Sequence, residues 1–407
     1  MAYSFTERDV GFLDSASGRD MLVRASALPL TEASRLADVT AVRAFAGEWA
    51  PAVLETAVLR RRAAAKLAGA ADWLTTDAAL QQATATPVAE LRATRFAGRD
   101  VHDVTCSIGA DLVALAAVAD RCLGSDLDPV RLLMARHNLG RTGRSAPLLR
   151  ADALRPVSRD SAVLADPARR DDAGRRRWRL ADLVPALPEL VDAYQGRDLA
   201  VKSAPGLDFT AVPWAKEIEL VSLDGQVREA CLWTGGLAGA GIARRATVLR
   251  QSSPLWTITD VESDDCPVRA VGEWLVDPDG AVVRAGLVRH YAARHGLGQL
   301  DPRIAYLTGD TRPPDTRAFR VFDHGRYAEK ALRATLRRHD VGSLEILVRG
   351  LPVDPDALRR RLRPTGSRSA TVVLTRVGDT PMSYLCEAFP ASTGRSDPPG
   401  TDYRLST

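Results

Sequence analysis

The feature that most constrains the fold is the stretch Asp103-Val-Thr-Cys-Ser-Ile-Gly109, with Asp126 following 17 residues after the glycine. It reads as a strand, a glycine turn, a helix and a second strand that ends in an acid. This order is typical of doubly wound α/β sheets that hold an adenosine ligand. The backbone turns sharply at the glycine, and an acid about 20 residues further on can accept two ribose hydroxyls. We therefore expect Gly109 and Asp126 to lie at a nucleotide-type site.

The composition of the first loop narrows the choice of ligand. Dinucleotide-binding loops usually contain three glycines, because their backbone approaches a pyrophosphate closely. This loop has Gly109 alone and offers Asp103. A carboxylate there would repel a phosphate but suits a cationic amino-acid tail. The expected ligand is therefore S-adenosylmethionine rather than NAD, and the expected chemistry is methyl transfer.

Strand and helix patterns alternate between residues 98 and 235, which predicts a parallel sheet. The expected fold is α/β: a Rossmann-like methyltransferase sheet of parallel strands that ends in an antiparallel hairpin. Helices are predicted at Val130–Leu139 and Leu180–Tyr194. The predicted strands are Val101–Cys106, Cys122–Asp126, Pro147–Ala151, Ala162–Asp166 and Leu199–Ser203, with the hairpin formed by Glu217–Leu223 and Gln226–Trp233 around Asp224-Gly225.

The flanking segments have different patterns. Apolar residues recur at helical spacing in the N-terminal part, for example at Leu22, Ala25 and Leu28. The C-terminal part alternates predicted helices with predicted strands and reads as an α+β module. We therefore divide the chain into a helical N-terminal domain (1–97), a methyltransferase domain (98–240), a mixed connecting region (241–310), an α+β domain (311–391) and a polar, disordered tail (392–407).

Charge and cysteine usage limit the classes of partner. The net charge is only +4, but the segment from Asp301 to Glu387 contains 16 Arg or Lys against 11 Asp or Glu. This local excess hints at nucleic-acid contact. The five cysteines and six histidines show no metal-ligand spacing, and the cysteines are expected to be reduced thiols of a cytoplasmic protein. No signal peptide and no run of about 18 apolar residues is found, so we expect neither export nor a membrane span.

Acids follow four successive predicted strands, at the edge where open α/β sheets bind ligands. Asp103 belongs to the first loop, and Asp126 is the candidate for the ribose diol. Asp152 can accept the adenine amino group, and Asp166 lies where a methyl acceptor would bind. Asp128 precedes Pro129 and is better explained as a helix N-cap.

These motifs resemble the class I S-adenosylmethionine-dependent methyltransferases. The chain is more narrowly similar to bacterial methyltransferases with a C-terminal THUMP-like domain, through the segments 201–208, 301–310 and 348–350. A fainter similarity to RNA cap guanine-N2 methyltransferases lies around residues 60–96. The resemblance implies an RNA substrate, because THUMP domains generally bind RNA. It also implies a cofactor site formed by Asp103, Cys106, Gly109, Asp126 and Asp152.

The acceptor motif Asp166-Pro167-Ala168-Arg169 departs from the family pattern Asp/Asn/Ser-Pro-Pro-aromatic. We expect Asp166 and Pro167 to be catalytic, with the acid orienting an amine. Arg169, Arg170 and Trp178 are candidates for substrate binding, because an arginine plane or an indole can stack on a base. The basic loop that contains them could equally be solvated surface.

The expected function is methyl transfer to an RNA base amine, with the C-terminal module docking the RNA. Two alternatives stay open. One is a methyltransferase for a small molecule or a protein, and the other is a non-catalytic RNA-binding protein that keeps the sheet. A second arginine cluster consists of Arg359-Arg360-Arg361 with Arg363. It is better explained as solvated surface, because successive helical residues point in different directions.

Overall fold

The computed structural model describes residues 3–169, 180–250 and 253–391. The chain forms two compact units, the first comprising Met1–Glu217 with Ala230–Ala240 and the second Ile218–Glu229 with Gly241–Thr407. The domain division expected from the sequence is finer than these two units and stays a prediction.

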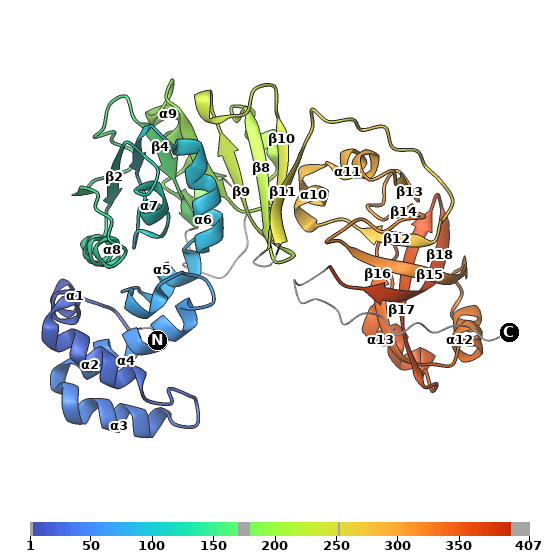
Figure 1. Ribbon diagram of the computed structural model, residues 1–407, viewed down its shortest axis with the longest axis horizontal. Helices are drawn as coiled ribbons and strands as arrows, with labels where there is room; N and C mark the ends of the chain where they lie inside the picture. Colours follow the sequence, from blue (N-terminus) through green and yellow to red (C-terminus); the bar gives the residue numbers. More distant parts are fainter. Residues whose placement is uncertain (1–2, 170–179, 251–252, 392–407) are drawn as a thin grey trace. The chain divides into compact units, whose positions relative to one another are not determined.

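The N-terminal part of the first unit is helical, as its apolar periodicity predicts. Its first helix begins with a capping box, in which the side chains of Thr6 and Asp9 each accept a backbone N–H of the other residue. Leu13 and Leu22 from neighbouring helices are fully buried in a shared apolar core. The helices, drawn in blue in Figure 1, are α1 (Glu7–Asp14), α2 (Ala16–Ser26), α3 (Arg35–Ala46), α4 (Ala50–Ala63), α5 (Asp77–Gln82) and α6 (Thr86–Ala93).

The predicted parallel sheet is confirmed in the first unit. Its strands are hydrogen-bonded in the order β9-β7-β4-β1-β2-β3, and all of them run parallel except β9, which is antiparallel to β7. Every residue of β4 is buried, as expected when helices cover both faces of a parallel sheet. The strands are β1 (Asp100–Asp103), β2 (Arg121–Asp126), β3 (Leu148–Arg150), β4 (Ala162–Ala165), β7 (Leu199–Ser203) and β9 (Gln226–Trp233).

The strand order reverses at β1. The chain moves from β1 outward to β2 and β3, and then returns to the other side of β1 with β4 and β7. Ligands of open α/β sheets bind outside the carboxyl ends of the strands at such a switch point, because the connecting loops diverge there and leave a crevice. The helices of this region are α7 (Ala110–Leu115), α8 (Pro129–Arg141) and α9 (Leu187–Ala193).

Two expectations for this region were wrong in extent. The predicted helix Leu180–Tyr194 is shorter, since only its second half forms α9, with Pro188 in the first turn. Pro185 disfavours α-helix in the residues before it, and the first half begins with a short 3-10 turn at Leu180–Asp182. That half instead contributes β6 (Leu183–Val184), which pairs antiparallel with β5 (Ala168–Arg169). The first strand is also shorter than predicted and ends at Asp103, so Cys106 lies in the loop.

The second unit begins with the predicted hairpin, whose first strand is β8 (Glu217–Leu223). Its turn contains Asp224 and Gly225, both with positive φ, as expected for a two-residue hairpin loop. β10 (Arg244–Arg250) runs parallel to β8, and β11 (Ser253–Thr259) runs antiparallel to β10. Two short helices follow, α10 (Gly280–Ala285) and α11 (Val288–Arg294).

A second sheet forms the C-terminal part of this unit, with the order β13-β14-β12-β15-β18-β17-β16. The ten-residue strand β15 escaped prediction, because Arg320, His324 and Gly325 interrupt its apolar pattern. The strands of this second sheet are β12 (Trp274–Asp277), β13 (Gly298–Gln299), β14 (Leu307–Gly309), β15 (Arg317–Arg326), β16 (Val341–Val348), β17 (Arg368–Val377) and β18 (Thr380–Phe389).

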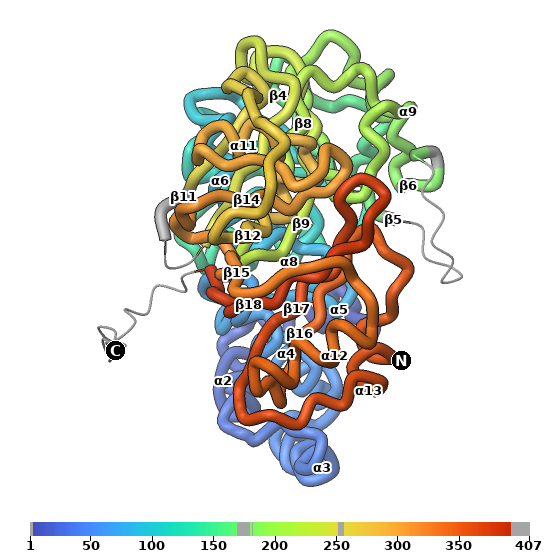
Figure 2. Tube along the Cα trace, turned by 90° about the vertical axis from the view of Figure 1, so that its right-hand side faces the viewer, coloured from blue at the N-terminus to red at the C-terminus, as the bar shows by residue number. Residues whose placement is uncertain are grey.

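Two helices, α12 (Glu329–Arg338) and α13 (Pro355–Leu362), cover one face of this sheet. Figures 1 and 2 show both of them beside β16 and β17. Leu332 and Leu336 of α12 share a buried cluster with Leu358 and Leu362 of α13. The apolar faces of the two helices are therefore turned to the sheet, and their polar faces are left outside.

Candidate active site

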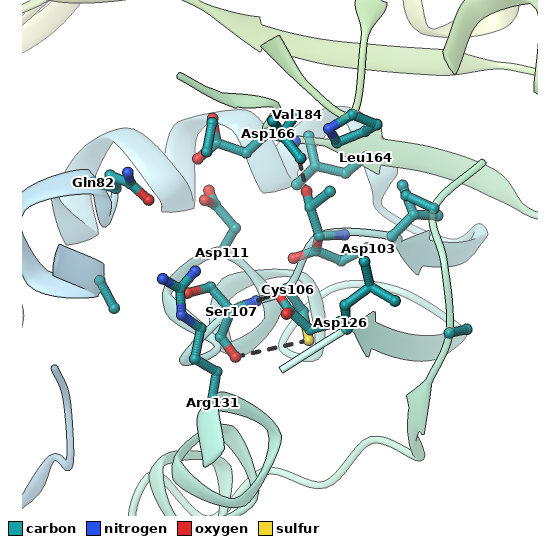
Figure 3. A pocket seen from close by; sticks show the side chains of 18 of the residues that line it. Gln82, Asp103, Cys106, Ser107, Asp111, Asp126, Arg131, Leu164, Asp166 and Val184 are labelled. Carbon is teal, nitrogen blue, oxygen red and sulfur yellow. Dashed lines mark hydrogen bonds between the residues drawn. The ribbon is translucent and has the colours of Figure 1, made fainter. Parts of the chain in front are cut away.

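A cavity of about 470 Å³ lies in the first unit, around the loops that follow β1, β2, β3 and β4. Its volume is within the range of about 300–1,000 Å³ that small-molecule sites usually have. Figure 3 shows Asp111 and Asp166 pointing into it, with Arg131 reaching in from α8. The four acids expected at the strand ends all line this cavity: Asp103, Asp126, Asp152 and Asp166.

The loop after β1 is shaped by two residues in the left-handed region. Gly109 has φ +85° and its N–H donates to the carbonyl oxygen of Cys106 at 2.8 Å. A Cβ on Gly109 would make an ordinary contact, 3.4 Å from the side chain of Ala135 on α8, so the left-handed conformation and not the space favours glycine here. Ser107 also has a positive φ of 48°. Gly109 therefore shapes the turn and does not itself line the cavity.

Asp126 ends β2 and is held by the same loop. One carboxylate oxygen accepts the Ser107 N–H at 3.0 Å, and the other accepts the Asp128 N–H at 2.9 Å. Each oxygen keeps a further lone pair with which to accept a hydroxyl. Asp128 caps α8 as predicted, accepting the N–H groups of Val130 and Arg131. The carboxylate of Asp126 is thus oriented in advance, as binding a ribose diol requires.

Asp152 lies two residues after β3, and one of its carboxylate oxygens accepts the Leu154 N–H at 2.9 Å. Leu127, Ala153 and Leu154 line the cavity beside it. An apolar wall with one carboxylate is the environment that an adenine ring and its amino group need.

Asp103 and Cys106 are buried on the cavity wall. Burial, followed by the charge of Asp111, raises the pKa of Asp103 well above its usual range, although the Thr105 N–H and Lys202 oppose the shift. Burial and the neighbouring charges of Asp103 and Asp126 likewise raise the pKa of the Cys106 thiol. Cys106 is therefore a neutral thiol, whereas a cation placed beside Asp103 would stabilise its ionised form.

A buried ionic network borders the cavity near the acceptor motif. Asp111 on α7 pairs with Arg92 of α6 and accepts the Thr84 hydroxyl at 2.8 Å. Lys202, at the end of β7, donates to Asp111 at 3.2 Å and also pairs with Asp166. Burial tends to raise the pKa of Asp111, but Arg92 and Lys202 outweigh it and lower the value to about 2. Lys202 thereby joins a structural acid to the candidate catalytic acid.

Asp166 follows β4 directly, and its backbone N–H donates to the Thr105 hydroxyl at 2.6 Å. Pro167 is buried behind it and does not line the cavity, whereas Ala168 does. Arg169 contributes backbone pairing to β5, and its side chain is outside the described part of the structure. Arg170 and Trp178 lie outside the described residues altogether.

The arrangement suits S-adenosylmethionine. Six acids line the cavity, whereas the nearby cations are Arg131 in the lining and Arg92 and Lys202 in the bordering network. This excess of carboxyl groups favours a ligand with a cationic tail and disfavours a phosphate. The residues that would hold it are those with free acceptor capacity: Asp126 for the ribose, Asp152 for the adenine amino group and Asp103 for the cationic tail.

Sequence reasoning missed part of the site. Lys202 could have been noticed, because only four of the 55 basic residues are lysines and this one ends a predicted strand. Asp111 stood two residues after Gly109 but looked like an ordinary first-turn acid of a helix. Arg92, and the cavity contacts of Ala79 and Gln82 from α5, carried no local signal. These residues reach the site only through the packing of the N-terminal helices.

Neither a metal site nor a membrane span emerges from the described residues. Among residues 3–169, 180–250 and 253–391, no cluster of three or more His, Cys, Asp or Glu side chains could hold a metal ion. In the same ranges no helix is long and apolar enough to cross a membrane.

Comparison with known proteins shows what the domains and the fold resemble. A family model described as THUMP domain-like matches residues 316–388, and one described as a domain of unknown function (DUF8688) matches residues 7–63. A crystal structure from Porphyromonas gingivalis, of a protein assigned as a methyltransferase, shares the fold with a TM-score of 0.70. It is 18% identical and covers 94% of this chain and 99% of its own.

Closer relatives come from two strains of Mycobacterium tuberculosis. Each is described as an uncharacterized S-adenosylmethionine-dependent methyltransferase. Each is 57% identical over 353 residues, which cover 84% of this chain and 98% of the relative. The resemblance noted in the sequence and the expected cofactor are thereby confirmed, and the chain belongs to the S-adenosylmethionine-dependent methyltransferases.

Proposed function

We propose that this methyltransferase modifies an amine nitrogen of an RNA base. The observation that carries the proposal is the position of Asp166, a carboxylate at the carboxyl end of β4 that lines the cavity and is paired with Lys202. A fixed hydrogen-bond acceptor beside a methyl-donor site suits a nucleophile that carries N–H groups. Such an acceptor aligns the nitrogen lone pair with the methyl carbon.

Bound S-adenosylmethionine supplies an activated methyl group on a sulfonium. The side chains of this protein then have to align the amine, exclude water and take up a proton. In the transfer the N–C bond forms as the S–C bond breaks, and the amine loses one proton. Asp166 accepts a hydrogen bond from the amine N–H and then takes up the proton that the nitrogen releases, while Lys202 and the Thr105 hydroxyl hold Asp166 in place.

Support for RNA as the acceptor comes from the second unit. A THUMP domain-like model matches residues 316–388, and the segment from Asp301 to Glu387 carries five more basic than acidic residues. A basic module in the same chain as the cavity favours a polyanionic substrate. A small metabolite would require no such module.

The direct test is transfer of a tritiated methyl group to three classes of acceptor: unmodified RNA transcripts, total protein and a small-molecule extract. We expect label in the RNA, released on digestion as an N-methylated nucleoside. The Asp166→Ala variant should retain cofactor affinity and lose turnover, whereas Asp192→Ala, an exposed acid on α9, should behave as wild type. Label confined to protein or to small molecules would overturn the proposed acceptor.

A further inference from the structure

A second hollow lies in the second unit, between α12 and α13. It is open to solvent, and its volume is about 750 Å³. A smaller hollow of about 100 Å³ adjoins it and shares Arg333, Arg337, Leu362 and Arg363 with it. We call the larger one the arginine groove; its lining residues are Glu329, Arg333, Arg337, Ala357, Arg360, Arg361, Leu362 and Arg363.

The positive charge of the groove is only partly neutralised. Glu329 is its one acid, and this carboxylate is shared by Arg333 at 3.1 Å and Arg361 at 2.9 Å. The guanidinium groups of the remaining three arginines form no hydrogen bond or ion pair with any residue that the structure describes. These three are Arg337, Arg360 and Arg363, and all are exposed.

Helix geometry explains how the groove collects these side chains. Arg359, one position before Arg360, is turned to the sheet and donates to the Leu344 carbonyl oxygen at 3.0 Å. Consecutive arginines of α13 therefore serve different surfaces, as their angular spacing requires. Arg360 lies opposite the stripe of α12 formed by Arg333 and Arg337, which are four residues apart and so share one face. The packing of the two helices thus brings arginines of α12 and α13 to the same groove, which one helix alone could not do.

Arg363 contributes a further guanidinium group to the groove from the end of α13. It ends α13 with φ 47° in the left-handed region, where glycine is the usual residue. The side chain of Arg363 lines both hollows.

We propose that the arginine groove binds the phosphodiester backbone of the RNA substrate, an inference that rests on the proposed function. Guanidinium groups match phosphate oxygens bidentately, and three without a hydrogen-bonded or ion-paired partner can each take one. Most stable protein interfaces depend on buried aromatic or apolar anchors, and stable docking on a membrane surface depends on apolar side chains that insert into it. The apolar lining is limited to Ala357 and the buried Leu362, so the groove offers none.

The test compares two double variants of the full chain. Arg337→Gln with Arg360→Gln removes two charges from the groove. Arg228→Gln with Arg284→Gln removes two from exposed arginines elsewhere in the second unit, whose side chains likewise form no hydrogen bond or ion pair with the described residues. Binding of a fluorescein-labelled RNA hairpin is measured by anisotropy between about 50 and 200 mM salt. Calorimetry with S-adenosylhomocysteine and circular dichroism verify the cofactor site and the fold.

Each duplex phosphate contact contributes about 0.9 to the magnitude of the slope of log K against log salt. One contact therefore makes the binding constant at roughly 0.1 M salt about 8-fold larger relative to its value at about 1 M salt. The groove variant should therefore lose about 1.8 from the slope and on the order of 10- to 60-fold in affinity. The control variant should lose little. Equal losses of RNA affinity in the two variants, or no loss in the groove variant, would overturn the proposed role of the groove. Neither result would contradict an RNA substrate. If wild-type protein binds cofactor but no RNA, the proposed function itself fails.

Discussion

Replacing Asp111 with asparagine tests whether the buried ionic network holds the cavity together. The side chain keeps its shape but loses its charge, so Arg92 and Lys202 keep their buried positions with one carboxylate fewer. Asp111 contacts both cations, and the Thr84 hydroxyl bonds to it as well. The variant should therefore be strongly destabilised while its fold at low temperature stays native.

The magnitude follows from two estimates. The pKa of Asp111 is lowered from 3.8 to about 2, and a shift of this size corresponds to about 2 kcal/mol of folding free energy at neutral pH. Leaving buried cations with too little countercharge costs about 3–5 kcal/mol when one partner of a buried pair is removed. We expect Asp111→Asn to lower the free energy of unfolding by about 2–5 kcal/mol.

The pH dependence has a defined sign. Because the pKa of Asp111 is lower in the folded state than in the unfolded state, its contribution is fully present above about pH 4. It is lost as the pH falls through about 2. Urea unfolding of wild type and variant should therefore differ by a constant amount between pH 5 and 8, and the two curves should converge under acid. A difference below about 1 kcal/mol at pH 7, or one that grows on acidification, would refute the proposed pairing.

Three further substitutions test the cavity. Asp126→Ala should weaken S-adenosylmethionine binding by roughly 10- to 150-fold, the value of one or two charge-assisted hydrogen bonds; unchanged calorimetric affinity would rule out its contact with the ribose. Lys202→Met should reduce turnover by about 100-fold with cofactor affinity nearly unchanged, because Asp166 loses its positioning partner. The exposed Lys216→Met serves as its control, and equal activity of the two would contradict the role of Lys202. Gly109→Ala should lower the free energy of unfolding by about 1–2 kcal/mol in urea titrations, since φ +85° is costly for alanine; a neutral effect would show that the turn relaxes.

The sequence alone determined the order of strands and helices in the first unit and the acids that end its strands. Both follow from short-range rules: apolar periodicity separates strands from helices, and glycine or proline marks the turns. Asp126 and Asp166 could be chosen because carboxyl ends of parallel strands meet at one edge of a sheet. The helix predicted at residues 180–194 was too long for an equally local reason, because Pro185 disfavours helix in the residues before it.

Only the tertiary structure decided which distant residues meet. Lys202 reaches Asp111 across 91 residues of sequence, because the strand order brings β7 close to the centre of the sheet. Arg92 joins them through the packing of α6 against α7. In the second unit, the arginines of α12 and α13 form one groove because both helices bury their leucines on the same face of the sheet. These contacts depend on long-range packing. A pattern of residue types along the chain does not say how far apart two distant residues lie in space.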